Sequence, residues 1–108
     1  MSVEEPAGTM PVDVDPIIHA VSRLRIMTVL VGFHPDARVA FSRLRTLLDM
    51  TPGNLLAQLQ TLAAAGYVRL EQQGRGRNSR TSASVTPAGR AAYAQYARTI
   101  RALLNSPA

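Results

Sequence analysis

Three leucines recur at helical spacing in the middle of the chain, between residues that start and stop helices. Leu55, Leu59 and Leu62 are four and three residues apart, which predicts the buried face of an amphipathic helix. The Thr-Pro pair at 51–52 suits the start of this helix, and Gly66 suits its end. The positions opposite the leucines carry small or polar side chains, so the helix offers a surface that a partner can approach closely.

Two helices are predicted before this one. Asp15-Pro16 can open the first of them, and Gly32 can end it. Its inward stripe is expected to hold Ile17, Val21, Leu24, Met27 or Thr28, and Val31. Ser22-Arg23 could mark a break in it. After a short extended piece at 39–41, Ser42 is expected to cap a short second helix with Leu44, Leu47 and Leu48 inward.

The pattern changes to strands after Gly66. Tyr67, Val68 and Leu70 suit one strand, and the alternation of residues 81–85 suits a second. The segment QQGRGRNSR between them supplies glycines for a turn and arginines for charge. Thr86-Pro87 then repeats the helix start, and one face of the last helix carries Tyr93, Tyr96, Ala97, Ile100, Leu103 and Leu104.

This order of elements predicts a mostly helical α+β fold, a winged helix-turn-helix with a two-stranded β-wing and a C-terminal dimerisation helix. The domain is expected to span residues 15–105, after a flexible acidic tail at residues 1–14. All twelve basic residues are arginines, and they follow this tail, whereas Glu4, Glu5, Asp13 and Asp15 crowd the N-terminus. The basic remainder favours a polyanionic partner.

Several function classes find no support in the sequence. The chain has no cysteine, and its two histidines, His19 and His34, are far apart and are expected to have no acidic partners, so we predict no metal site and no cofactor. No nucleophile-base set or carboxylate pair indicates an enzyme. No apolar run is long enough to span a membrane, and no signal peptide is evident, so we expect a cytoplasmic protein.

Four segments together resemble a known family: HAVSRLRIM, FSRLRTLL, TPGNLLAQLQTLAAAGYV and VTPAGRAAY. They are similar to the small winged-helix transcriptional regulators on the border of the MarR-like and ArsR-like groups. The resemblance implies a homodimer that binds a pseudo-palindromic operator in double-stranded DNA, often as a repressor released by a small-molecule effector. Leu56 and Gln58 depart from the usual small polar residue and histidine, so base preference does not carry over.

The candidate DNA-contacting residues lie on the third helix and in the arginine-rich hairpin. The helix is expected to enter the major groove and the hairpin to hold phosphates. On the helix these residues are Thr51, Gly53, Asn54, Ala57, Gln58, Gln60 and Thr61, and in the hairpin Arg75, Arg77, Asn78 and Arg80. Arg43 and Arg45 could add backbone contacts or pair with Asp49, and structural ion pairs are expected for Arg23 and Arg25.

The apolar faces of the first and last helices predict the dimer interface. Its candidate residues are Ile17, Val21, Tyr93, Tyr96, Ile100, Leu103 and Leu104. The two tyrosines could instead line a ligand pocket or pack in the core. Two other functions stay open: a winged helix that binds only proteins, and a chromosome-binding protein with little sequence preference.

Overall fold

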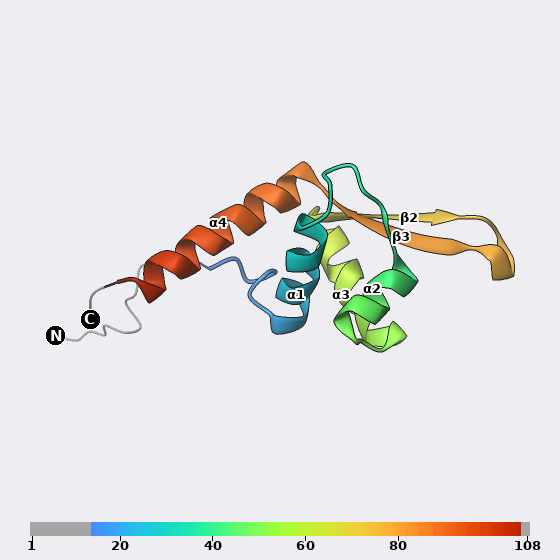
Figure 1. Ribbon diagram of the computed structural model, residues 1–108, viewed down its shortest axis with the longest axis horizontal. Helices are drawn as coiled ribbons and strands as arrows, with labels where there is room; N and C mark the ends of the chain where they lie inside the picture. The colour runs from blue at the N-terminus through green and yellow to red at the C-terminus, as the bar shows by residue number, and fades with distance from the viewer. Residues whose placement is uncertain (1–13, 107–108) are drawn as a thin grey trace.

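The computed structural model describes residues 14–106, and these residues form four α-helices and a three-stranded antiparallel sheet (Figure 1). The elements follow one another as α1 (Val21–Val31), β1 (Val39–Ala40), α2 (Phe41–Leu48), α3 (Pro52–Ala64), β2 (Val68–Gln73), the 3₁₀ turn η2 (Gly76–Asn78), β3 (Arg80–Val85) and α4 (Pro87–Leu104). The tail predicted for residues 1–14 lies outside the described residues except for Val14.

The first helix begins later than predicted. Asp15 does cap backbone amides, since its Oδ1 accepts from the N–H groups of Ile17 at 2.8 Å and Ile18 at 3.3 Å. Ile17 and Ile18 belong to a single turn, however, and the chain is extended at Ala20 before α1 starts. Arg23 donates from Nε to the Ile17 carbonyl at 2.6 Å, so a side chain satisfies the group that a continuous helix would bond.

The inward face predicted for this helix was correct only in part. Val21 is 77% exposed, and Thr28 is exposed as well. Met27 is fully buried, as predicted, and Ile17, Leu24 and Val31 are half-buried and pack against the core. Ile18, Ile26 and Leu30, which were not on the predicted stripe, are buried as well. The break at Ala20 separates the turn from the helix, so a single stripe cannot run through both.

The second helix differs from its prediction in two respects. It starts at Phe41 after Ala40, and no side chain caps it, so Ser42 is not the cap. Ala40 is already paired with Ser82 in the sheet, and this pairing fixes where the chain turns into α2. Leu44 and Leu48 are buried as expected, whereas Leu47 is 49% exposed.

The third helix confirms its prediction. Thr51 Oγ1 accepts from the amide of Asn54 at 3.3 Å, and Pro52 occupies the first helical position. Its three inward leucines are fully buried, and they anchor the helix in the core. Gly66 adopts a φ of +83°, which a residue with a side chain rarely accepts, and turns the chain into β2.

The wing belongs to a larger sheet than the two strands predicted. The strand order is β1-β3-β2, because β1 pairs with β3 through Val39 with Ala83 and Ala40 with Ser82. β2 and β3 pair along their whole length, from Val68 with Val85 to Gln73 with Arg80. The sequence predicted an extended piece at 39–41, but a two-residue strand such as β1 shows no periodicity, so its pairing with β3 was not predicted.

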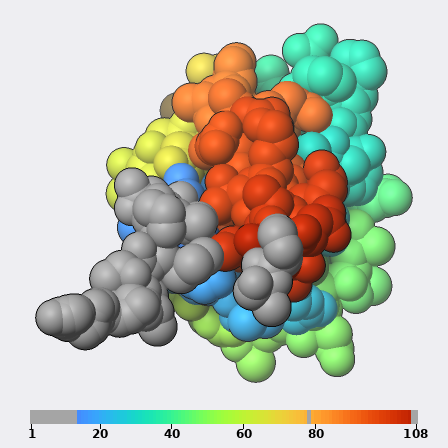
Figure 2. Space-filling model, turned by 90° about the vertical axis from the view of Figure 1, so that its left-hand side faces the viewer, coloured from blue at the N-terminus to red at the C-terminus, as the bar shows by residue number. Residues whose placement is uncertain are grey.

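The last helix is capped by Thr86 and starts at Pro87, as predicted. The Oγ1 of Thr86 accepts from the amide of Gly89 at 2.9 Å and donates to the carbonyl of Gly66 at 2.6 Å. α4 leads away from the wing toward the opposite end of the molecule (Figure 1). It lies on the outside, in the middle of the face turned to the viewer in Figure 2. The base of α4 is therefore fixed while much of its length remains on the surface.

Candidate nucleic-acid interface

The outward face of α3 is small and polar. Because Leu55, Leu59 and Leu62 are buried, the opposite side of the helix faces outward. Thr51, Gly53, Asn54, Ala57 and Gln60 are exposed, whereas Gln58 and Thr61 are half-buried. Small side chains at two of the exposed positions leave room for a close approach of another backbone.

Gln58 is held in place by its neighbours. Its Oε1 accepts from Nη1 of Arg23 at 2.8 Å, and its Nε2 donates to Oδ1 of Asn54 at 3.2 Å. Arg23 had been expected to form a structural ion pair, and it forms hydrogen bonds to an amide and a carbonyl instead. The sequence did not indicate this connection, since Arg23 and Gln58 are 35 residues apart.

The hydroxyl proton of Thr61 is already engaged within α3, so this side chain can only accept from a partner. Its hydroxyl donates to the carbonyl of Ala57 in the preceding turn, at 3.2 Å. Asn54 and Gln60 therefore carry most of the polar groups that α3 offers outward. Leu56, between them, is 40% exposed and adds an apolar contact surface.

The wing tip is a cluster of exposed cations. Gly74 and Gly76 adopt positive φ values of 84° and 55°, and they allow the tight turn between β2 and β3. Arg75, Arg77 and Arg80 are exposed, and within residues 14–106 none of their guanidinium groups has a hydrogen bond or ion pair. The side chain of Asn78, the remaining candidate in the wing, lies outside the described part of the structure.

Other arginines are engaged within the fold. Arg25 donates to the carbonyl of Leu48 at 2.7 Å. The guanidinium of Arg43 lies over the ring of Phe33, 5.5 Å from its centroid. Among the described residues neither Arg43 nor Arg45 pairs with Asp49. In the described part of the chain, the wing tip thus brings together three exposed arginines whose guanidinium groups have no partner.

Arg90 fixes the base of α4 to the end of α1. Its two terminal nitrogens donate to the carbonyls of Val31 at 3.2 Å and Phe33 at 2.8 Å. These contacts satisfy backbone acceptors that the end of a helix leaves open. The position of α4 relative to the rest of the fold is thus set at its first turn.

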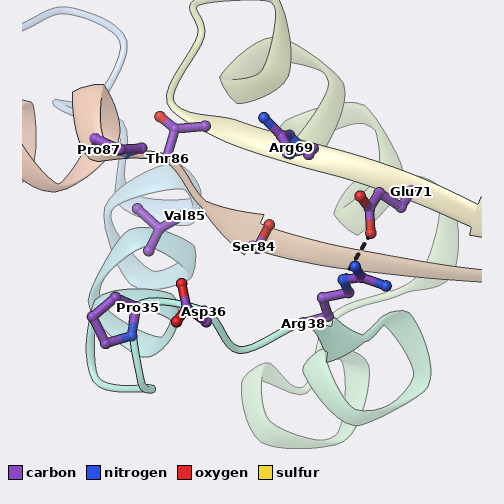
Figure 3. Close-up of a pocket in the computed structure, with 9 residues that line it drawn as sticks. All are labelled: Pro35, Asp36, Arg38, Arg69, Glu71, Ser84, Val85, Thr86 and Pro87. Atoms are coloured by element: carbon purple, nitrogen blue, oxygen red, sulfur yellow. Dashed lines mark ion pairs between the residues drawn. The ribbon is translucent and has the colours of Figure 1, made fainter.

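A polar pocket of about 320 Å³ lies between the sheet and the loop before β1 (Figure 3). Arg38 and Glu71 face each other there, with Nε and Oε1 3.0 Å apart. Asp36 and Arg69 also line it, so acidic and basic side chains are balanced. This balance gives the pocket no preference for an anion or a cation.

The tyrosines make contacts within the chain. Tyr96, a predicted interface residue, is 7% exposed, and its hydroxyl lies 2.8 Å from Nδ1 of His19. Tyr93 shares a 2.9 Å hydrogen bond with Thr28. The other residues predicted for the dimer interface range from half-buried (Ile17, Ile100, Leu103) to largely exposed (Val21 at 77% and Leu104 at 80%).

The hydroxyl of Tyr67 donates to Oδ2 of Asp15 at 2.6 Å. This bond raises the pKa of the Tyr67 hydroxyl, and the burial of Tyr67 and the negative charge of Asp15 raise it further. The expectation that the histidines have no acidic partner was wrong for His34, whose Nδ1 lies 4.0 Å from Oδ2 of Asp36. Across residues 14–106, no group of three or more acidic or histidine side chains could hold a metal ion. No helix in that same part of the chain has the length and hydropathy needed to cross a membrane.

Comparison with known proteins agrees with this geometry. A family model described as "Winged helix DNA-binding domain" matches residues 22–104. Among solved structures, the chain is similar to a transcriptional regulator homologue from Pyrococcus horikoshii OT3, with 27% identity and a TM-score of 0.72. The match covers 82% of this chain and 85% of that one. No curated protein matches the chain.

Proposed function

The chain belongs to the family of winged helix DNA-binding domains, and from this premise we propose that it is a homodimeric transcriptional repressor with a pseudo-palindromic operator. The sequence resemblance to MarR-like and ArsR-like regulators supports this more specific assignment. The observation that carries it is the wing tip, where three exposed arginines have no partner among the described residues. A winged helix that bound only proteins would not need such a cluster.

α3 and the wing would make different kinds of contact with DNA. The small polar face of α3 suits the major groove, where Asn54 and Gln60 could reach base edges. The wing arginines suit phosphates or a narrow minor groove beside it, because long cationic side chains on a turn tolerate variation in position. α3 would then determine the sequence, and the wing would supply sequence-independent affinity.

Dimerisation would use the exposed apolar side chains of α1 and α4. Val21 and Leu104 are the two most exposed large hydrophobic residues of the described chain. Ile17, Tyr93, Ile100 and Leu103 are half-buried and would contribute further apolar area. Covering it with a second copy would remove apolar area from water, which is the main source of free energy for such association.

The test is selection of bound duplexes from a random pool, followed by footprinting on the selected sequence. We expect two symmetric half-sites about 10 base pairs apart centre to centre, or a multiple of that. A single unsymmetric half-site would contradict the dimeric model. Binding without sequence preference would favour a chromosome-binding protein, and absence of binding at low salt would favour a protein-interaction module.

A further inference from the structure

Three polar side chains form a chain of hydrogen bonds from α1 to the outward face of α3. Arg23 donates from Nη1 to Oε1 of Gln58 at 2.8 Å, and Gln58 donates from Nε2 to Oδ1 of Asn54 at 3.2 Å. Arg23 is itself anchored, because its Nε donates to the carbonyl of Ile17 at 2.6 Å. We call the hydrogen-bonded series Arg23–Gln58–Asn54 the relay. Asn54, at its end, is exposed.

The relay has a fixed direction. A guanidinium can only donate hydrogen bonds, so Gln58 must turn its oxygen toward Arg23. The amide nitrogen of Gln58 then faces Asn54 and needs an acceptor, so Asn54 must turn its oxygen toward Gln58. The Nδ2 amino group of Asn54 is left to point away from the relay, as a donor with two hydrogens.

This direction matters for base recognition in the major groove. Asparagine reads adenine with both ends of its amide, because Oδ1 accepts from N6 while Nδ2 donates to N7. An Oδ1 already bonded to Gln58 is poorly placed for that arrangement. Guanine offers two acceptors on the same edge, N7 and O6, and an amino group can donate to both.

We propose that Arg23, acting through Gln58, orients Asn54 as a hydrogen-bond donor, so that α3 prefers guanine at the base pair that Asn54 contacts. Arg23 is a positioning residue here and Asn54 is the reader. The inference rests on the proposed function, since it concerns how α3 reads DNA.

The experiment measures the affinity of the full-length protein for duplexes carrying each of the four base pairs at every position of the selected site. The position at which Asn54→Ala loses discrimination is the one that Asn54 reads. The wild type should prefer guanine there. Arg23→Met should reduce this preference by roughly tenfold, the order of one bidentate base contact.

Gln58→Glu provides the opposite test. The introduced carboxylate still accepts from Arg23, but it presents an acceptor to Asn54 and therefore reverses the amide of Asn54. The preference at that position should shift from guanine toward adenine or cytosine, which offer an exocyclic amino donor. Arg25→Met is the matched control, because Arg25 is on the same helix and donates to Leu48 outside the relay.

Two results would overturn the inference. If Asn54→Ala weakens all sequences equally and lowers the salt dependence, Asn54 contacts a phosphate. If Arg25→Met reduces the guanine preference as much as Arg23→Met, charge rather than the relay is responsible. Should Arg23→Met fail to fold, Gln58→Glu decides the outcome alone. Wild-type protein that binds no DNA would instead refute the proposed function itself.

Discussion

The backbone carbonyl of Tyr67 lies directly against Gly89 in the first turn of α4, so that no side chain fits between them. A Cβ at position 89 would lie 2.9 Å from the carbonyl carbon of Tyr67 and 3.0 Å from Cγ2 of Val85. Replacing Gly89 with Ala should therefore destabilise the fold by about 1–3 kcal/mol, the usual cost of overpacking. Urea denaturation monitored by circular dichroism measures this change.

Gly53→Ala is the matched control for this prediction. Gly53 lies in the first turn of α3, and a Cβ there would meet nothing within 4 Å. Alanine favours helix over glycine, so this variant should gain up to about 1 kcal/mol. A Gly89→Ala protein as stable as the wild type would show that the backbone of Tyr67 can move away.

The hydrogen bond between Tyr67 and Asp15 predicts a loss of stability at high pH. It raises the pKa of the Tyr67 hydroxyl in the folded state, so the protonated hydroxyl stabilises the fold. This contribution to the free energy of unfolding is fully present below the ordinary tyrosine pKa of about 10. It declines as the pH rises through the pKa that Tyr67 has in the folded state.

The measurement compares unfolding free energies of the wild type and Tyr67→Phe between pH 8 and about 11. The advantage of the wild type should shrink above about pH 10. Asp15→Asn removes the negative charge that contributes to the shift, so it should weaken the pH dependence. A constant difference between wild type and Tyr67→Phe over this range would rule out the contribution.

Changing Ile100 and Leu104 to Glu should dissociate the proposed dimer and weaken operator binding. Leu104 is 80% exposed in the single chain, so its replacement should leave the fold intact while placing charge in the interface. Sedimentation at micromolar concentration measures the assembly state. Leu47→Glu, on α2 and 49% exposed, is the control and should remain dimeric. A monomeric wild type would refute this model of assembly.

The wing and α3 should respond differently to mutation. Arg77→Ala should weaken binding to specific and random DNA together, and the slope of log affinity against log salt should fall by about 0.9. Arg98→Ala, on α4, removes the same charge away from the wing and should change the slope little.

Replacing Asn54 or Gln58 with Ala should instead cost about 1–3 kcal/mol on the preferred site and little on random DNA. The ratio of specific to random affinity separates this effect from that of Arg77→Ala. If Arg77→Ala erased sequence preference while both helix variants kept it, the roles of reader and anchor would be reversed.

The parts of the fold that follow local rules could be predicted from the sequence. α3 and α4 each begin with a threonine cap and a proline, and Gly66 ends the first of them; these signals depend on neighbours within a few residues. The hairpin of the wing is local for the same reason. Its alternation in residues 81–85 was visible in the sequence and matches β3.

The features that the sequence did not reveal depend on contacts between distant residues. The relay arises because Arg23 reaches Gln58, 35 residues further along the chain. A break in the first helix was expected at Ser22-Arg23, and the structure places it two residues earlier, at Ala20. β1 exists because two residues meet β3 more than forty positions later. Neither spacing nor propensity encodes such pairings, which require the packed fold.

The strand order β1-β3-β2 places β3 in the centre and makes β1 and β2 the edge strands, where pairing with another chain would begin. Each edge is poorly suited to such pairing. β1 is only two residues long, and β2 carries Arg69 and Glu71, charged side chains that hinder edge-to-edge pairing. The protein can therefore expose a long hairpin to DNA with a low risk that hairpins from different copies join into fibres.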